Sequence, residues 1–202
     1  MEFLPFPKIP RLKREVCITE KLDGTNAQVH IRPLDPTTAA FVFGIDTQVT
    51  LPDGRQAALR AGSRNRWLPN SPEGEDNYGF GKWVYQHAHE LAALGEGQHF
   101  GEWWGLGIGR GYRMTEKRFS LFNVHRWADG RQPRPACCDV VPTLGWGAWT
   151  LVDECLARLR EQGSVAAPGC MNPEGIIIYH GASKSYFKAT LDKDDLPKGA
   201  AE

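Results

Sequence analysis

The sequence predicts an α+β fold built on antiparallel sheets with flanking helices. Short apolar or alternating segments, which are typical of strands, outnumber the two segments in which apolar residues recur at helical spacing. The two helical segments fall irregularly among the strands, so the regular strand–helix alternation of a doubly wound parallel sheet is missing. The 202 residues, of which 41% are hydrophobic, suffice for a sizeable core. We therefore expect one domain over residues 1–202.

The first half of the chain is expected to contain an irregular basic arm followed by strands. Residues 1–15 carry Pro5, Pro7 and Pro10, which break regular structure, and several basic side chains. The pair Asp53-Gly54 is a strong signal for a hairpin turn. We expect strands, recognised by their apolar runs, at residues 16–22, 27–31, 41–45 and 57–61.

The second half is expected to contain both helices and the remaining strands. Apolar residues recur at helical spacing over residues 80–94, and Gly95 can end that helix. The second helix is expected over residues 151–161, with Thr150 as its N-cap and Gly163 at its end. We expect further strands at 98–104, 118–127, 174–179 and 185–191. Residues 128–138 are expected to form a polar connection, and residues 192–202 a polar tail.

Composition narrows the class of protein. Lysine and arginine together number 24, as do aspartate and glutamate, so the formal net charge is zero. Nucleic acid would therefore have to be bound by a local basic patch. The five cysteines form no Cys-x-x-Cys pair, so no zinc site is visible and reduced thiols are expected. The sequence shows neither a signal peptide nor an apolar run of membrane-spanning length. We therefore expect a cytoplasmic location and no membrane partner.

The segment Glu20-Lys21-Leu22-Asp23-Gly24-Thr25-Asn26 follows an apolar run and places a lysine in a tight polar loop. A lysine amine attacks phosphorus only when it is unprotonated, and a free lysine has a pKa of about 10.4. A nucleophilic lysine therefore needs neighbours, or a nearby metal complex, that lower this pKa. Asp23 supplies a carboxylate, and Gly24 allows the backbone to approach a ligand. A surface turn beside a lysine would give the same local pattern.

Five other positions suit the binding of a nucleotide or its metal. Arg64 suits a phosphate or ribose contact, because a guanidinium matches phosphate oxygens, although a solvated surface arginine would look the same. Glu102 and Glu174 stand in apolar surroundings, where a carboxylate needs a cation, a ribose hydroxyl or a structural ion pair. Lys188 lies within a strand and suits either a bound phosphate or an edge position. Phe122 suits either the core or stacking on a base.

The glycines at every second residue from Gly105 to Gly111 invite comparison with a nucleotide-binding loop. A dinucleotide fingerprint needs G-x-G-x-x-G at the start of a helix, and this spacing is absent here. The sequence also lacks the G-x-x-x-x-G-K-[ST] pattern. A nucleotide would therefore be bound without a phosphate-binding loop of either type.

In their order along the chain, these segments resemble the motifs of the covalent nucleotidyltransferase superfamily, which contains ATP-dependent RNA and DNA ligases and mRNA capping enzymes. The segment from Glu20 to Asn26 resembles the nucleotidyl-lysine motif, and Asn26 with the Glu-Trp-Trp-Gly run points to the RNA ligase branch. The other motifs resembled, in order, are Ser63-Arg64, Phe100-Gly101-Glu102-Trp103, Phe119-Ser120-Leu121-Phe122-Asn123-Val124, Pro173-Glu174-Gly175-Ile176-Ile177-Ile178 and Tyr186-Phe187-Lys188-Ala189-Thr190. The resemblance spans residues 17–191 and implies two antiparallel sheets with flanking helices, in an ATP-grasp-like nucleotidyltransferase core.

The resemblance also implies a role for each residue. Lys21 would attack the α-phosphate of ATP, expel pyrophosphate and form lysyl-AMP, with Asp23 and Lys188 completing the catalytic group. Lys188 would hold the α-phosphate and help to keep Lys21 unprotonated. The metal would be Mg2+, for which Mn2+ can substitute, positioned by Glu174. The residues implied to contact the nucleotide are Glu20, Asn26, Arg64, Glu102 at the ribose, Phe122 at the adenine, Glu174 and Lys188.

The implied function is ATP-dependent RNA ligation. AMP would pass to a 5′-phosphate end, and a 3′-hydroxyl would then attack that end and release AMP. The substrates would be ATP and RNA or nicked polynucleotide ends. The sequence shows no C-terminal oligonucleotide-binding domain, so we expect either a minimal ligase or one with a partner protein that supplies substrate binding.

Two departures from the motifs leave alternatives open. The last motif usually carries two alternating lysines, and Tyr186 stands in place of the first, while Asn123 replaces an aspartate after Phe122. These departures favour an alternative of another class, a non-catalytic nucleic-acid-binding protein with the same fold. The enzymatic alternatives are a GTP-dependent mRNA capping guanylyltransferase and a DNA ligase. NAD is not expected as the donor, because the residues before Lys21 leave no room for a nicotinamide-binding domain.

Overall fold

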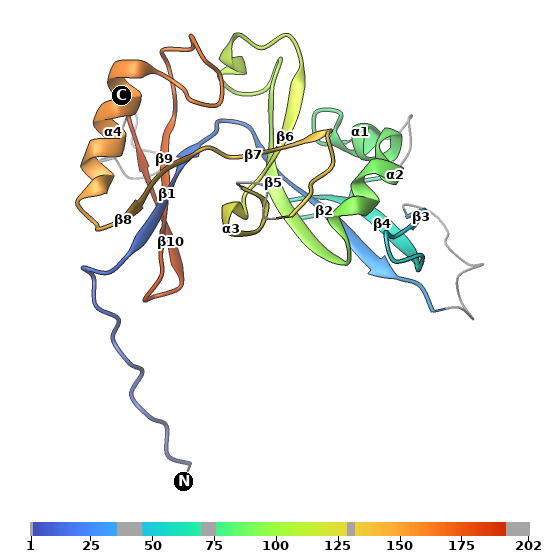
Figure 1. Cartoon of the computed structure of the whole chain (residues 1–202), viewed down its shortest axis with the longest axis horizontal. Helices are drawn as coiled ribbons and strands as arrows, with labels where there is room; N and C mark the ends of the chain where they lie inside the picture. Colours follow the sequence, from blue (N-terminus) through green and yellow to red (C-terminus); the bar gives the residue numbers. More distant parts are fainter. Residues whose placement is uncertain (1, 36–45, 70–75, 129–131, 193–202) are drawn as a thin grey trace. The chain divides into compact units, whose positions relative to one another are not determined.

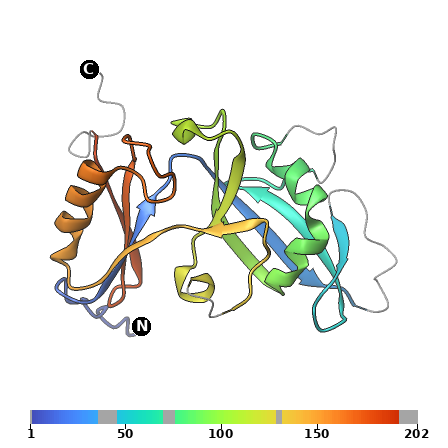
Figure 2. The same ribbon diagram turned by 45° about the horizontal axis from the view of Figure 1, so that its top comes forward.

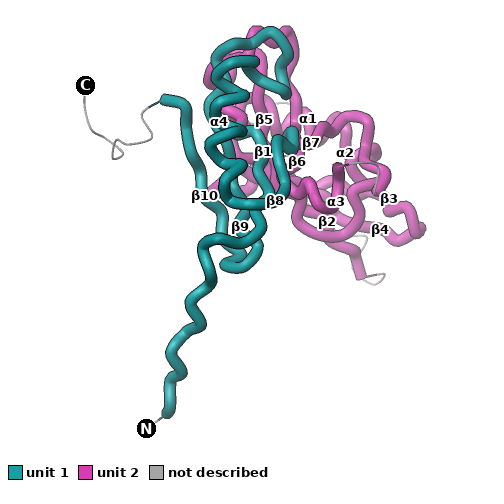
Figure 3. The backbone as a smooth tube through the Cα atoms, turned by 60° about the vertical axis from the view of Figure 1, so that its left-hand side comes forward, with its two compact units in different colours: residues 1–21, 142–202 teal, residues 22–141 magenta. Residues whose placement is uncertain are grey.

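The computed structural model of the chain has the predicted α+β architecture, with two sheets and a few flanking helices (Figure 1). It describes residues 2–35, 46–69, 76–128 and 132–192. The chain forms two compact units, coloured separately in Figure 3: unit 1 comprises residues 1–21 and 142–202, and unit 2 comprises residues 22–141. The first passage from unit 1 to unit 2 therefore falls directly after Lys21.

Unit 1 is a four-stranded antiparallel sheet with one helix on one face (Figure 2). Its elements are β1 (Val16–Lys21), β8 (Thr143–Gly147), α4 (Leu151–Gln162), β9 (Gly175–His180) and β10 (Ser185–Thr190), with the strand order β10-β9-β1-β8. Alternate residues of the central strands, such as Ile18 and Ile176, are fully buried in a core that also contains Leu159 of α4. This alternation leaves the other face of the sheet for polar side chains.

The ends of α4 follow the prediction in part. Gly163 ends the helix with φ of 80°, and its amide donates to the carbonyl of Leu159. Glycine adopts this left-handed conformation without steric cost, which explains the clear sequence signal. Thr150 is the N-cap residue, as predicted, but its side chain makes no capping hydrogen bond.

Unit 2 is a six-stranded sheet whose core lies beneath two short helices. Its strands, in spatial order, are β3 (Thr47–Thr50), β4 (Gln56–Ser63), β2 (Thr25–Pro33), β5 (Gly97–Gly105), β6 (Lys117–Leu121) and β7 (Cys138–Val140). All neighbouring strands are antiparallel except β6 and β7, which are parallel. The predicted hairpin is confirmed, because Asp53-Gly54 lies in the turn that joins β3 to β4.

Two predicted elements are interrupted in the structure. The expected helix at 80–94 is split into α1 (Phe80–Gln86), α2 (Ala88–Leu91) and a 3-10 turn, with the break at His87. The expected strand at 118–127 ends at Leu121 and gives way to the short helix α3 (Val124–Trp127). Asn123 starts α3, since its side-chain oxygen accepts a hydrogen bond from the amide of Arg126.

Other predictions are incomplete or fall outside the described residues. Strands β7 and β8 were not predicted, whereas the expected strand at 41–45 and residues 193–202 of the expected tail lie outside the described ranges.

Among the helices that the structure describes, none is long and apolar enough to cross a membrane.

The side chains of strand β2 alternate between the two faces of the large sheet. Ala27, Val29 and Ile31 are fully buried in the core with α1 and α2. The intervening residues therefore point to the opposite face, because successive side chains alternate along a strand. These residues are Asn26, Gln28, His30 and Arg32, and we call this side the open face of unit 2.

Candidate active site

Lys21 is the last residue of β1 and is held by a carboxylate of its own unit. Its Nζ lies 2.6 Å from Oε2 of Glu174, with 22% and 18% of the two side chains exposed. Strand pairing explains the contact, because Lys21 lies opposite Gly175, the first residue of β9, and Glu174 directly precedes it. The predicted nucleophile and the predicted metal ligand are therefore in direct contact.

Lys188 projects from the same face of the sheet as Lys21. In the strand register, Lys188 lies opposite Ile177, and Ile177 lies opposite Thr19, two residues before Lys21. Only β9 separates β1 from β10, so the two strands are ~10 Å apart. The face opposite α4 thus carries two lysines, one of which contacts the carboxylate of Glu174.

Tyr186 occupies the same face, at the position where the resemblance leads one to expect a further lysine. It lies opposite Tyr179, and the centroids of the two rings are 4.9 Å apart. Partial burial of the phenol, followed by the neighbouring Tyr179 and Cys17, raises the pKa of Tyr186, so the phenol is neutral near pH 7. Lys184 lies in the turn before β10 with φ of 54°. The register between β9 and β10 has no bulge, so Tyr186 and not Lys184 occupies this position of the strand.

Glu20 points to the other face of this sheet, into the core with α4. Its side chain is buried, and its carboxylate accepts hydrogen bonds from Ser164 Oγ at 2.6 Å and from the amides of Val165 and Ala166 at 2.9 Å each. Burial raises the pKa of Glu20, while the three hydrogen bonds act in the opposite direction. The carboxylate thus ties the end of β1 to the segment after α4, a contact that the sequence did not predict.

Asp23 in unit 2 is enclosed by the glycine-rich segment of residues 105–111. Its carboxylate accepts a hydrogen bond from the backbone amide of Arg110 at 3.0 Å. It also forms an ion pair with the guanidinium of Arg110 at 3.5 Å. Its own amide donates to the hydroxyl of Tyr112 at 2.9 Å. Gly109 has φ of 52°, and an added Cβ there would lie 2.7 Å from Asp23 Cγ. The alternating glycines therefore shape a loop around Asp23.

Gly24 is explained by the close approach of strand β5. An added Cβ would overlap the carbonyl oxygen of Trp103 and would lie 2.7 Å from Cβ of Trp104. Protein atoms thus account for this glycine without any ligand.

We expect the substitution Gly24→Ala to lower the free energy of unfolding by about 1–3 kcal/mol, because the backbone of β5 must move to admit a methyl group. Urea denaturation measures this change. Gly181→Ala is the matched control, since the nearest atom to an added Cβ there is at 3.5 Å, an ordinary contact. Equal stability of the two variants would contradict the proposed overlap.

Two predicted nucleotide contacts are neighbours on the open face of unit 2. Asn26 in β2 lies directly opposite Glu102 in β5. Beside them, the side-chain amide nitrogen of Gln28 donates to the backbone carbonyl of Ser63 at 3.2 Å. The Gln28 side-chain oxygen is buried and has no hydrogen-bond partner among the described residues. A buried acceptor of this kind suits a donor group from a ligand.

Arg64 and Phe122 lie at the ends of strands of unit 2. Arg64 is exposed in the turn after β4, where Ser63 donates to the carbonyl of Arg66. Phe122 is 38% exposed, whereas Phe119 of the same motif is fully buried. Of the two phenylalanines of this motif, Phe122 is therefore the accessible one.

Glu174 is the candidate metal ligand of unit 1. No group of three or more His, Cys, Asp or Glu side chains in the described part of the chain could hold a metal ion. Magnesium in phosphoryl-transfer sites is commonly held by one or two carboxylates together with the phosphates of the substrate. Glu174 fits such a donor set.

The comparisons with known proteins bear on the whole chain. Residues 14–190 match a protein-family model described as RNA ligase, and this range contains every candidate site residue. A search of the curated proteins found no match, and neither did a search of the solved structures. The family match covers most of the chain and agrees with the two-sheet α+β fold. The chain therefore belongs to the RNA ligase family.

Proposed function

We propose that the protein is an ATP-dependent RNA ligase that works through lysyl-AMP at Lys21. The observation that carries the proposal is the arrangement on unit 1, where Lys21 contacts Glu174 and shares a sheet face with Lys188. Family membership supports a ligase function in general. The nucleotide, the intermediate and the residue roles are our inference from this arrangement.

In the first step, Nζ of Lys21 attacks the α-phosphorus of ATP. A nitrogen–phosphorus bond forms, the bond to the leaving oxygen breaks and pyrophosphate departs. The amine must lose its proton before it attacks, and a positive charge nearby favours the neutral form. Lys188 supplies that charge from the same face and can pair with the α-phosphate oxygens. The contact with Glu174 fixes the position of the amine.

Glu174 is also the residue that would hold magnesium. When bound together with the phosphates of ATP, magnesium would neutralise charge that develops on the phosphate oxygens. Asp23 is proposed to act by holding the loop after Lys21, since its carboxylate is tied to Arg110. Glu20 is proposed to act indirectly, by anchoring the end of β1.

For the nucleoside and the polynucleotide end, we propose the roles that the motifs imply. Glu102 binds the ribose hydroxyls, Phe122 stacks on the adenine, and Asn26 and Arg64 bind phosphate groups or the polynucleotide end. In the second step, a 5′-phosphate oxygen attacks the phosphorus of lysyl-AMP and frees Lys21. In the third step, a 3′-hydroxyl attacks the activated 5′-phosphate, forms the phosphodiester and releases AMP.

A labelling experiment separates this proposal from its alternatives. The protein is incubated with magnesium and α-labelled ATP or GTP, and the denatured protein is examined for covalent label. We expect label from ATP only, and its transfer to RNA on addition of a nicked RNA duplex with a 5′-phosphate. A nicked DNA duplex of the same sequence serves as the control substrate.

Each other outcome points to a named alternative. Label from GTP would indicate a capping guanylyltransferase, and faster sealing of the DNA duplex would indicate a DNA ligase. No label from either nucleotide, with a folded protein, would leave a nucleic-acid-binding protein that retains the fold.

A further inference from the structure

The open face of unit 2 extends beyond the predicted nucleotide contacts as a polar stripe along β2. Asn26, Gln28, His30 and Arg32 follow one another on this face, while the residues between them are buried in the core. The distance from Asn26 to Arg32 along the strand is ~20 Å. A nucleic-acid strand that follows this stripe would span about six base-pair steps of roughly 3.4 Å each.

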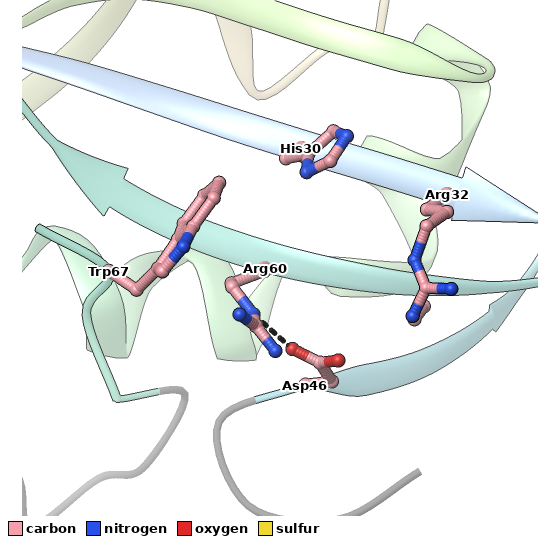
Figure 4. A pocket seen from close by; sticks show the side chains of 6 residues that line it. His30, Arg32, Asp46, Arg60 and Trp67 are labelled. Carbon is pink, nitrogen blue, oxygen red and sulfur yellow. Dashed lines mark hydrogen bonds and ion pairs between the residues drawn. The ribbon is translucent and has the colours of Figure 1, made fainter.

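A small pocket lies at the far end of this stripe (Figure 4). It is lined by His30 and Arg32 of β2, Ala58 and Arg60 of β4, Trp67, and Asp46 before β3. The strand register places His30 opposite Arg60 and Arg32 opposite Ala58. Figure 4 shows Trp67 on one side and Arg32 on the other, with the remaining labelled side chains between them.

The wall formed by Trp67 is rigidly held. Its ring stacks on His30, with centroids 5.7 Å apart and planes inclined by 16°, and the Arg60 guanidinium lies 5.2 Å from its centroid. Asp46 forms an ion pair with Arg60 and thereby balances its charge. In the ranges that the structure describes, no such ion pair involves Arg32, whose exposed side chain provides the net positive charge.

His30 contributes a hydrogen-bonding group rather than a charge. Burial, followed by the charges of Arg32 and Arg60, lowers the pKa of His30, and Asp46 opposes this only in part. A neutral imidazole still offers one N–H donor. The pocket therefore presents a cation and further N–H donors to a bound group.

The size of the pocket limits what it can hold. Its volume is about 140 Å³, well below the roughly 300 Å³ at which sites for whole small molecules begin. A complete nucleotide does not fit, whereas a single phosphate group does.

We propose that this pocket binds a backbone phosphate of the RNA substrate, at the end of the β2 stripe remote from Asn26. The inference rests on the proposed ligase function for the identity of the strand. Arg32 binds the phosphate oxygens, His30 and Arg60 contribute N–H donors, and Trp67 and Asp46 hold these groups in place. A phosphate of ATP is the competing source of the same chemistry, and the test below distinguishes the two.

The test compares Arg32→Gln with Arg55→Gln in the full-length protein. Arg55 is the matched control, because it is an exposed arginine of unit 2 outside the pocket, paired with Asp53 and Glu96. Fluorescence anisotropy with a labelled nicked RNA duplex gives the affinity between 50 and 200 mM KCl. We expect Arg32→Gln to weaken binding about tenfold and to reduce the salt slope by roughly 0.7–0.9, as for one lost phosphate contact. We expect Arg55→Gln to change affinity less than about twofold.

A second measurement separates RNA from ATP and this inference from the proposed function. Formation of lysyl-AMP needs no RNA, and we expect its rate and KM for ATP to be the same in Arg32→Gln and the wild type. A raised KM for ATP would overturn the inference in favour of an ATP phosphate. Equal RNA affinity and salt slope in the two variants would overturn it as well. Weaker RNA binding by Arg32→Gln would support it even if the wild type formed no lysyl-AMP, an outcome that would sink only the ligase mechanism.

Discussion

The Lys21→Ala protein is expected to form no covalent adduct with ATP and to lose at least about 10⁴-fold of its ligation rate. Alanine has no nucleophile, and removal of a covalent nucleophile commonly costs an enzyme several orders of magnitude. The loss should not reflect unfolding, because the Lys21–Glu174 pair is partly exposed and such pairs contribute little to stability. We therefore expect the free energy of unfolding to change by less than about 1 kcal/mol.

The control for this experiment is Lys184→Ala. Lys184 is exposed, lies in the same unit and falls in the turn before β10, at the opposite end of the strands from Lys21. It should keep the adduct and the ligation rate of the wild type. The measurements are covalent labelling with α-labelled ATP, sealing of a nicked RNA duplex and urea denaturation. A persistent ATP adduct on Lys21→Ala would show that another residue is the nucleophile, and Lys188 would be the first residue to examine.

Sequence patterns predicted those elements whose signals are local. Strand β1 and helix α4 combine strongly apolar segments with clear ends, such as Gly163. The segment after Leu121 misled the prediction, because Phe122 and Val124 continue a strand-like alternation while the Asn123 cap starts a helix. An asparagine N-cap also accounts for the departure from the expected aspartate, since both residues cap helices equally well. Strands β7 and β8 are short, and only pairing with distant strands reveals them.

The contacts that hold the candidate site residues could not be predicted from the sequence. The order of the motifs pointed to Lys21, Glu174 and Lys188, and strand pairing in unit 1 accounts for their positions. The partner of Asp23 lies 87 positions away, and that of Glu20 lies 144 positions away. Such separations leave no local signal, apart from the alternating glycines at 105–111. That pattern indicated an unusual loop without indicating what it encloses.

Glu20, which the resemblance implies as a nucleotide contact, has a buried carboxylate that is hydrogen-bonded within unit 1, and its substitution should have the largest effect on stability. In Glu20→Ala, the Ser164 hydroxyl and the amides of Val165 and Ala166 lose their acceptor in a buried setting. Each unsatisfied group costs about 1–3 kcal/mol, and relief of the buried charge offsets part of the total. We expect the free energy of unfolding, measured by urea denaturation, to fall by about 3 kcal/mol.

Glu20→Gln is the matched variant that separates anchoring from nucleotide binding. Its amide oxygen can accept from the two backbone amides, and its amino group can donate to Ser164, so we expect stability within about 1 kcal/mol of the wild type and an unchanged rate of lysyl-AMP formation. Because the folded-state pKa of Glu20 is raised, the pH-dependent part of its contribution to stability is complete below the pKa of an unfolded glutamate and is lost as pH rises through the folded value. Glu20→Gln should lack this dependence. A folded Glu20→Gln protein with a raised KM for ATP would instead place the carboxylate at the nucleotide.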